Sequence, residues 1–560
     1  MMERARRLAS RAPWVYPALV VLVALGPALY AVYAQTFATL GRDHGIFQYV
    51  AWALRHGERA YKDFHEINGP LPHAYFMGMQ LLGGEDEHTF RTLDTLVLAT
   101  SWTVGSLTIP RWAGLTTTRP WLWALAGLAV LGAQYTRYDW WHSAQREALY
   151  AALVFASLAL QSIAHTTKAP RAATRALLAA GFFGALPWFG KPPCAVFAVL
   201  QVLVALHDRA SLPLSLRRAG AAAGAGIAIA GALMLAFMLA FEDLARGVAM
   251  LAKVPKLHHT IWNETLIGSY RAYRNSVTLN WAAISLGAFL VTYRVFRLPR
   301  RALLAVVLPV GGLLVFFGQG KAFPYHLHML TLGAGVAQLV VVAAIARVVQ
   351  DPETPRRAEV ALAGAALALG LGAKACVESL HCAALDRRWM SAGATPELRR
   401  SRAYFEAFGW GDFFANDLRD AAAYVAFKTT PDERVQIYGF DPYFLFLAKR
   451  KSASPVLYGF ELNVDAALEG GPGARPDAEL SQWLRDYRDE AEALVLATVE
   501  ASPPAAFALF DRAPFTFPPN AEKDFAAHCP RLFAFLERHY ERGPTFGTVR
   551  LWMRHDVMAR

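Results

Sequence analysis

Residues 14–33 read WVYPALVVLVALGPALYAVY, an uncharged apolar stretch that is long enough to cross a bilayer as a helix. A polar loop follows closely, with the sequence GRDHGIFQYVAWALRHGERAYKDFHEINGPLP at residues 41–72. Among its acidic residues are Asp43, Asp63 and Glu66. Carboxylates at a membrane surface are costly to gather unless their charge is used. The two segments together predict a membrane helix that leads into a candidate active-site loop.

The apolar pattern recurs along most of the chain. Apolar residues make up 55% of the sequence and aromatic residues 12%, and the mean hydropathy is +0.25. Long apolar runs continue to about residue 375 and then stop. On the criterion of roughly 20 apolar residues per span, we predict about eleven transmembrane helices. Their centres lie near Val23, Leu98, Leu128, Val154, Phe182, Val199, Ala230, Leu286, Val307, Val340 and Leu367.

The fifth and sixth of these segments are short. Pro187, Pro192 and Pro193 interrupt them, so we predict a re-entrant or half-length hairpin with Lys191 at its tip. With an odd number of spans, the arginine-rich loops all fall on the side of the N-terminus, which the positive-inside rule makes cytoplasmic. The first loop, at residues 35–89, and the C-terminal tail are then external. The net charge of +12 follows from this topology, and we find no nucleic-acid-binding motif.

Residues 376–560 are predicted to form a soluble external domain that follows a membrane domain at residues 1–375. The β-type runs RVQIYGF and AFALFD and the helical pattern AELSQWLRDYRDEAEALV, at residues 434–440, 506–511 and 478–495, favour a mixed α/β class. Disulfides persist on the external side of a membrane. We therefore expect one between Cys382 and Cys529.

The first loop resembles that of a known family. It has an early Asp in a charged run (RDHGIFQYVAWAL), a G-x-x-x-Y-x-D-F element (GERAYKDF) and a turn with a terminal Pro (HEINGPLP). This arrangement is similar to the first external loop of GT-C glycosyltransferases, which include protein O-mannosyltransferases and lipid A aminoarabinose transferases. Family members often have Lys-Pro-Pro where this chain has Asn68-Gly69-Pro70, so another residue must do the work of that lysine.

The resemblance implies an inverting glycosyltransferase in a bacterial inner membrane. Its donor would be a polyprenyl-phosphate sugar, and its acceptor a cell-envelope glycan, lipid or protein on the external face. Such a transfer needs a base near the acceptor hydroxyl and cations near the departing phosphate.

On the match RDHGIFQYV, the first-loop Asp of the family corresponds to Asp43, the expected base. The resemblance places Asp63 and Glu66 near the donor phosphate or a metal. From the residues alone, Asp43 could equally be a helix N-cap, and the other two could belong to a capped turn. No metal-ligand set is predicted, and a divalent cation at Asp43 is left open.

Cations for the phosphate come from later loops. A lysine in an apolar hairpin, such as Lys191, is costly unless an anion or water reaches it, and the alternative is that it snorkels to the interface. The turn GQGKAFPYHLH, at residues 318–328, adds basic side chains to a glycine-rich backbone that can approach a ligand. The loop at residues 242–276 is also basic. The resemblance implies phosphate-binding roles for Lys191, Lys321, His326, Arg271 and Arg274.

Candidate sugar- or acceptor-binding residues are Arg137, Tyr138, Asp139 and Tyr325. The first three lie in QYTRYDWWHSAQREALY, at residues 134–150, where aromatic rings could stack on the apolar faces of a sugar. The alternative for this aromatic segment is the interfacial belt expected at the end of any span.

A transporter or flippase of lipid-linked glycans is the alternative function. A transporter would place charge near the middle of the membrane and show inverted repeats. Here charge concentrates in the external loops, apart from Lys191, and no internal repeat stands out. A membrane scaffold with an external tail is a third possibility, but it leaves the first loop unexplained. The sequence therefore favours an enzyme.

Overall fold

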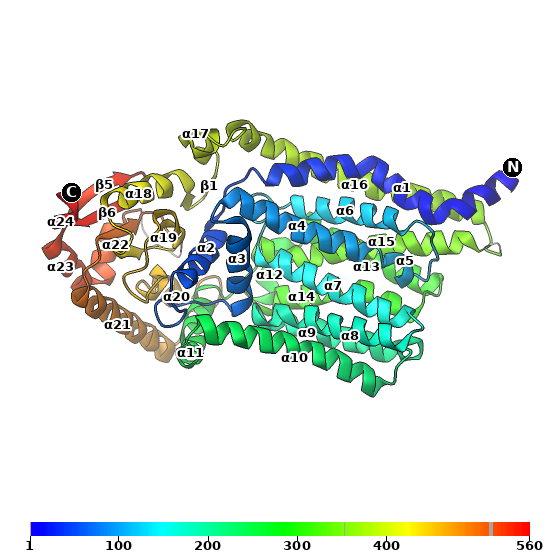
Figure 1. Ribbon diagram of the computed structural model, residues 1–560, viewed down its shortest axis with the longest axis horizontal. Coiled ribbons are helices and arrows are strands. Elements are labelled where there is room, and N and C mark those ends of the chain that lie inside the picture. Colours follow the sequence, from blue (N-terminus) through cyan, green and yellow to red (C-terminus); the bar gives the residue numbers. More distant parts are fainter. Residues whose placement is uncertain (1, 352, 515–518) are drawn as a thin grey trace. The chain divides into compact units, whose positions relative to one another are not determined.

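The computed structural model describes residues 2–351, 353–514 and 519–560, and it omits the side chains of residues 2–12, 251, 252 and 410. The chain divides into two compact units (Figure 1). Unit 1 consists of Met1–Ala38, His88–Met234 and Leu266–Met390. Unit 2 consists of Thr39–Glu87, Leu235–Thr265 and Ser391–Arg560. The first loop and the C-terminal tail, which are far apart in the sequence, therefore belong to the same unit.

Unit 1 is built from helices, most of them long and apolar, that run side by side (Figure 1). They are α1 (Met2–Gln35), α4 (Glu87–Ser106), α5 (Ile109–Trp112), α6 (Pro120–Thr136), α7 (Arg146–Thr166), α8 (Pro170–Ala185), α9 (Ala195–His207), α10 (Leu216–Phe241), α12 (Leu266–Tyr273), α13 (Val277–Val295), α14 (Leu304–Gly318), α15 (His328–Gln350) and α16 (Arg357–Ala392). The 3-10 helices are η1 (Leu186–Phe189), η2 (Pro192–Cys194), η3 (Arg209–Ser211), η4 (Arg300–Leu303) and η5 (Pro324–Leu327). The C-terminal ends of α10 and α16, from Leu235 and Ser391 respectively, and the first residue of α4 fall in unit 2.

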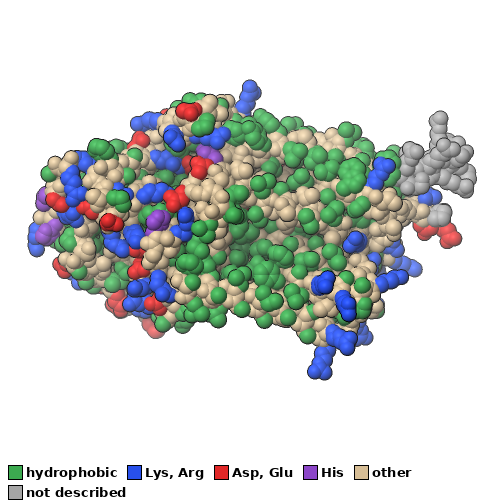
Figure 2. Space-filling view, viewed as in Figure 1, with side chains coloured by type: hydrophobic (Ala, Val, Ile, Leu, Met, Phe, Trp, Pro, Cys, Tyr) green, Lys and Arg blue, Asp and Glu red, His purple; other side chains and the backbone are tan. Residues whose placement is uncertain are grey.

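Among the described residues, seven helices are long and apolar enough to cross a membrane, and eight if α12 and α13, which bend by 95°, form one span. Every predicted span centre lies in a helix of unit 1. Hydrophobic side chains cover much of the face of these helices that Figure 2 shows. The predicted class, a polytopic helical membrane protein, is therefore confirmed, whereas the count of eleven spans and their orientation stay predictions.

Small side chains let the spans approach one another closely. One cluster joins α1, α6 and α16, and it consists of Ala24, Ala28, Ala129, Ala133 and Ala375. A second, between α7, α8 and α10, includes Ala164, Ala173, Ala176 and Ala222. Apolar burial drives little association between helices in lipid, so close packing of small residues is the main source of contact. Helix α15 packs against α1, α6, α7, α13 and α14 and forms the centre of the unit.

The chain is interrupted at the predicted tip around Lys191. Helix α8 ends at Ala185, η1 and η2 follow, and α9 begins at Ala195. Pro187 and Pro192 open these 3-10 turns, since proline cannot donate the backbone hydrogen bond that a continuing α-helix needs. Lys191 lies between η1 and η2, and its backbone N–H donates to the Pro187 carbonyl at 2.8 Å.

Unit 2 combines helices with a small sheet. Its helices are α2 (Arg42–Arg55), α3 (Pro70–Gly83), α11 (Leu244–Ile261), α17 (Arg402–Glu406), α18 (Ala415–Lys428), α19 (Tyr443–Ala448), α20 (Asp465–Glu469), α21 (Ala478–Ala501), α22 (Ala521–His528), α23 (Pro530–His539) and α24 (His555–Met558), with η6 (Leu398–Arg400) and η7 (Gly459–Glu461). Its strands are β1 (Gly409–Trp410), β2 (Phe413–Phe414), β3 (Val435–Tyr438), β4 (Ala506–Phe510), β5 (Tyr540–Phe546) and β6 (Val549–Arg554).

The main sheet has the order β3-β4-β6-β5. Strands β3 and β4 are parallel, with Val435 opposite Ala506, and the other pairs are antiparallel. Both parallel strands are buried along their whole length, as expected for strands covered on both faces. They coincide with the two predicted β-type runs, and α21 coincides with the predicted helical pattern. The mixed α/β class of the tail is therefore confirmed.

Two features differ from the expectations. The domain boundary expected after residue 375 falls inside α16. This helix does not stop where its apolar residues end; its more polar C-terminal part continues the same helix to Ala392. The expected disulfide is wrong, since all four cysteines are free. Cys382 is buried on α16, and Cys529 is buried inside unit 2 with its Sγ near the carbonyl of Leu462.

Candidate functional site

A cluster of charged side chains lies in unit 1 around Glu147, a buried residue in the first turn of α7. Its Oε1 accepts a hydrogen bond from Lys191 Nζ at 2.6 Å and lies 3.3 Å from Arg146 Nε. His326 Nε2 is 3.7 Å from the same oxygen. The other oxygen, Oε2, has no hydrogen-bond partner among the described residues. We call Arg146, Glu147, Lys191 and His326 the Glu147 cluster.

Close packing holds Lys191 in this cluster. A side chain at Gly190 would overlap the hydroxyl of Tyr150, one turn along α7 from Glu147, so only glycine allows the tip to approach the helix so closely. Lys191 is 8% exposed. Lys191 and Arg146 both approach the carboxylate of Glu147, and charge gathered at the end of a span is costly unless a solute anion or water reaches it.

The turn before α15 supplies further candidates. Ala322 has a φ of 51°, an unfavourable value for a residue with a side chain, and its carbonyl accepts a hydrogen bond from Tyr273 Oη at 2.7 Å. Lys321 lies near enough to His326 for their charges to interact. The Tyr325 ring packs edge-on against that of His326, with centroids 4.7 Å apart. The strained turn thus brings Lys321 and Tyr325 close to the Glu147 cluster.

Of the candidates at residues 137–139, Tyr138 is buried against α15. Its hydroxyl is 2.7 Å from Thr331 Oγ1, and its ring packs on His328 with centroids 3.9 Å apart. Arg137 lies 3.7 Å from Glu378 on α16. Both side chains therefore have partners that anchor the loop between α6 and α7.

Asp139 caps the same loop. Its Oδ1 accepts the backbone N–H groups of Trp141 and His142 and lies 3.0 Å from His142 Nδ1. Burial raises the pKa of Asp139, but the hydrogen bonds and charge of His142 outweigh burial and hold that pKa below its usual value. Asp139 is thus an ionised loop anchor at neutral pH.

Arg271 and Arg274 lie at the end of α12 and are exposed. Their side chains take part in none of the hydrogen bonds or ion pairs among the described residues. The structure therefore does not join these two arginines to the Glu147 cluster.

The first-loop candidates lie in unit 2, where Arg42 anchors the start of α2. Its Nε donates to Asp441 Oδ1 at 2.8 Å, and its NH1 donates to Asp412 Oδ1 at 2.9 Å. Burial lowers the pKa of Arg42, but the two carboxylates more than reverse this and raise it above the usual value. The next residue, Asp43, is half-buried in the first turn of α2. The N-cap is Gly41, so Asp43 is not the cap considered from sequence.

Helix α2 is fixed against the tail domain within unit 2. A side chain at Gly45 would overlap the ring of Tyr443 on α19, so α2 and α19 pack at a distance that only glycine permits. The hydroxyl of Tyr49 accepts the backbone N–H of Ser452 at 2.8 Å. The position of Asp43 therefore depends on residues of the tail.

The other two first-loop carboxylates hold the loop itself. Glu66 is 1% exposed; its Oε1 accepts the backbone N–H of Asn68 at 2.9 Å, and its Oε2 accepts the hydroxyl of Tyr458 at 2.9 Å. Asp63 accepts the backbone N–H of Arg59 at 2.7 Å, as in a capped turn.

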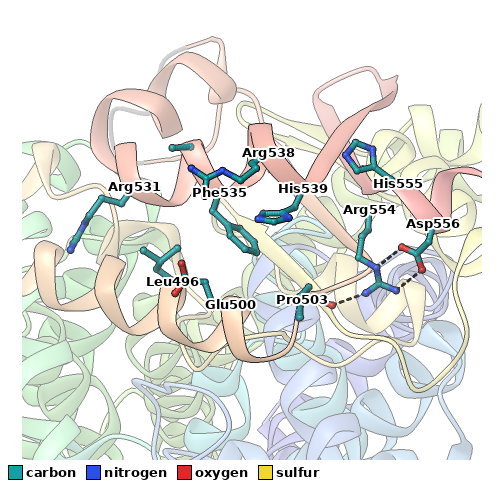
Figure 3. A pocket seen from close by; sticks show the side chains of 11 residues that line it. Leu496, Glu500, Pro503, Arg531, Phe535, Arg538, His539, Arg554, His555 and Asp556 are labelled. Carbon is teal, nitrogen blue, oxygen red and sulfur yellow. Dashed lines mark hydrogen bonds and ion pairs between the residues drawn. The ribbon is translucent and has the colours of Figure 1, made fainter.

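Unit 2 also has a groove of about 600 Å³ between α21, α23 and the end of β6 (Figure 3). Phe535 and Arg538 line it, and Arg554 pairs with Asp556 at 2.6 Å on one side. No residue predicted from the sequence lines this groove. Among the described residues, no group of three or more His, Cys, Asp or Glu is placed to hold a metal ion.

Comparison with known proteins found similarity to solved structures. No family model and no curated protein matches the chain. ArnT from Cupriavidus metallidurans is similar in the apo state (TM-score 0.49, 14% identity, 94% of this chain and 95% of that one) and bound to undecaprenyl phosphate (TM-score 0.49, 16% identity, 96% and 97%). An Archaeoglobus fulgidus oligosaccharyltransferase in complex with Zn and sulfate is also similar (TM-score 0.38, 13% identity, 78% and 61%).

ArnT and the oligosaccharyltransferase are both GT-C glycosyltransferases, the class that the first loop of this chain resembles. At these identities and TM-scores, the similarities transfer neither an activity nor a residue role to this chain.

The sequence did not point to Arg146 or Arg42, and it drew attention to Glu147 only as part of the segment at residues 134–150, with no role of its own. Arg146 and Glu147 stand directly before an apolar run, where a charged pair is also the ordinary boundary of a span. The sequence did contain one usable signal for this cluster: the acid Glu147 and the lone lysine Lys191 lie in apolar segments that are close in the sequence. A charge inside or at the end of a membrane span needs a partner, so these two residues could have been paired.

Proposed function

We propose that the chain is a membrane glycosyltransferase of the GT-C class that moves a sugar from a polyprenyl-phosphate donor to a cell-envelope glycan, lipid or protein. The observation that carries the proposal is the Glu147 cluster. It places Lys191, Arg146 and His326 on one carboxylate at the ends of spans, where a lipid-linked phosphate could reach them. Charge-assisted hydrogen bonds from Lys and Arg are the usual way to hold a phosphate.

In this proposal Lys191 and His326 bind the donor phosphate, and Lys321 adds charge from the adjoining turn. The cluster stabilises the negative charge that grows on the phosphate as the sugar departs. Glu147 keeps Lys191 in place, because the carboxylate is its hydrogen-bond acceptor at 2.6 Å. Tyr325, whose ring packs on His326, is the candidate contact for the sugar.

Asp43 is the proposed base for the acceptor hydroxyl. The assignment rests on the family match RDHGIFQYV and on the anchoring of Arg42 by Asp441 and Asp412, which fixes the start of α2. Asp63 and Glu66 are proposed as positioning residues, since backbone N–H groups and Tyr458 use their oxygens. The proposed active face is external, as the distribution of basic loops predicts.

The position of the cluster favours an enzyme over a flippase. Glu147 is the second residue of α7, and His326 lies in η5, directly before α15. A transporter of lipid-linked glycans would place its charged site near the middle of its spans. A site at the ends of spans suits chemistry on a headgroup at the membrane surface.

The test is transfer by the purified full-length chain. It is incubated with a panel of undecaprenyl-phosphate sugars and a cell-envelope extract, and mass spectrometry follows free undecaprenyl phosphate and the glycosylated product. We expect turnover of at least one donor, with loss of turnover in Asp43→Asn. Movement of intact donors between the leaflets of proteoliposomes, without any release of undecaprenyl phosphate, would instead establish the flippase.

A further inference from the structure

A second polar cavity lies in unit 1, at the other end of the helices from the Glu147 cluster. Its volume is about 570 Å³. It is formed by the loop between α5 and α6, the end of α7 and the start of the segment that leads into α14. Helix α7 connects the two sites: Glu147 is in its first turn, and its last residue, Thr166, lines this cavity. At 1.5 Å per residue, the two sites are about 29 Å apart along one span, the thickness of a bilayer core.

The cavity is positively charged. Arg111 is exposed at its wall, and Arg301 is half-buried and donates from Nε to the Arg111 carbonyl at 2.8 Å. A side chain at Gly114, another lining residue, would stand 3.6 Å from Arg347 Nε. Figure 2 shows Lys and Arg side chains gathered at the end of the helices where α5 lies.

One carboxylate, Asp208, lies near enough to Arg301 for their charges to interact, but a single carboxylate does not balance several arginines. Asp208 is held by His165, whose Nδ1 is 3.0 Å away, and by the hydroxyl of Ser211 at 2.6 Å. Helix α6 starts at Pro120 on the cavity wall, and no side chain caps its first amide groups. The N-terminus of a helix adds a further partial positive charge.

The remaining walls combine hydroxyls with apolar side chains. Thr117 and Thr167 each accept a backbone N–H at 3.2 Å, and those bonds leave their hydroxyl hydrogens to be donated elsewhere. Leu115 and Ile163 supply apolar surface between them. A site with arginines, hydroxyl donors and apolar walls at a membrane surface fits a phosphate ester that carries acyl chains.

We propose that this cavity binds the phosphate headgroup of an anionic phospholipid, in the leaflet opposite to the Glu147 cluster. Arg111 and Arg301 bind the phosphate, the threonine hydroxyls donate to its remaining oxygens, and the apolar walls contact the start of the acyl chains. The site is independent of the proposed glycosyl transfer. It lies on the side that the basic loops predict to be cytoplasmic, where anionic lipids are attracted to such pockets.

The test measures the thermal stability of the full-length protein, purified in neutral detergent. Dihexanoyl phosphatidylglycerol, dihexanoyl phosphatidylcholine and inorganic phosphate are titrated separately. We expect only the anionic lipid to raise the melting temperature at low concentration. In Arg111→Gln/Arg301→Gln the concentration for a half-maximal shift should rise about tenfold or more, since each basic residue near a lipid surface contributes about 1 kcal/mol. The control, Arg171→Gln/Arg218→Gln, removes the same charge from exposed arginines in the first turns of α8 and α10 and should change this concentration less than threefold.

The three titrations distinguish the possible ligands of the cavity. Phosphatidylcholine has the same phosphate diester, but its choline cancels the negative charge. Equal shifts with it would show that the site does not select an anionic lipid, and equal shifts with inorganic phosphate would make the ligand a free phosphate; either result overturns the proposal. An unchanged titration in the double variant also overturns it. Should that variant fail to fold, Arg111→Gln alone remains informative, because it keeps the Arg301 bond, which uses only the Arg111 backbone.

Discussion

Lys191 is predicted to have a role in donor binding that can be separated from its role in stability. In Lys191→Met, the buried Glu147 carboxylate loses its 2.6 Å partner and retains Arg146 at 3.3 Å and His326 at 3.7 Å. Removal of one partner of a buried ion pair costs about 3–5 kcal/mol, and the two remaining partners put this case near the lower value. Glu147→Gln should cost a similar amount, because it removes the acceptor of Lys191.

The double variant Lys191→Met/Glu147→Gln separates the two roles. With both charges gone, neither Lys191 nor Glu147 leaves the other buried without its partner, and Arg146, which also loses the carboxylate, is 18% exposed and can reach solvent. We therefore expect the loss of stability to shrink to about 1 kcal/mol. Donor binding should not recover. A charge-assisted hydrogen bond to phosphate contributes about 1.5–3 kcal/mol, so its loss weakens binding roughly 10- to 150-fold.

The assay titrates undecaprenyl phosphate into the purified variants and follows tryptophan fluorescence, with unfolding by SDS titration as the measure of stability. Lys374→Met is the matched control, since Lys374 pairs with Glu378 at 2.6 Å on α16 and should affect stability without changing donor affinity. If the double variant binds undecaprenyl phosphate, which carries the donor's phosphate, as tightly as the wild type does, Lys191 serves only to neutralise Glu147 and the phosphate-binding role is refuted.

Three further predictions concern the first loop and the turn after α6. Asp43→Asn should keep the melting temperature and lower turnover by about 10²–10⁴, the usual contribution of a general base, whereas near-normal transfer would remove Asp43 from the mechanism. Gly45→Ala should destabilise the protein by about 1–3 kcal/mol, because the new methyl group overlaps Tyr443; Gly78→Ala, which has open space around its Cβ, is the control, and equal melting temperatures would count against this packing. The pKa of Asp139 is lowered in the folded state, so its contribution to stability is present above about pH 4 and is lost as the pH falls through the folded pKa. The difference in stability between the wild type and Asp139→Asn should therefore shrink in acid. A difference that stays constant with pH would contradict this.

The helical segments and the tail class could be predicted because they depend on neighbours in the sequence. A run such as residues 14–33 is apolar enough to enter a bilayer whatever the rest of the chain does. The buried strands β3 and β4 likewise show in their own composition. The limits of the tail could not be predicted in this way, because α16 continues past its apolar half as one helix to Ala392.

The roles of the first-loop carboxylates could not be predicted from the sequence, because they depend on the partners that the fold gives to each of them. Asp63, Glu66 and Asp43 look alike in the sequence, as three carboxylates in one polar loop. The fold distinguishes them, because Tyr458 of the tail binds Glu66 and the Arg59 amide binds Asp63. The expected disulfide failed for the same reason, since the spacing of cysteines does not show where each thiol is buried.

The sequence by itself determined that this chain is a multi-span membrane protein with an α/β tail, and it pointed to the first loop and to Lys191. Tertiary structure alone decided which charges meet: Lys191 with Glu147 across 44 residues, and Arg42 with Asp441 across 399. The physical reason is the distance along the chain over which each effect acts. Apolarity and hydrogen-bonding period act between neighbouring residues, whereas a buried charge is satisfied by whichever partner the folded backbone brings within about 3 Å.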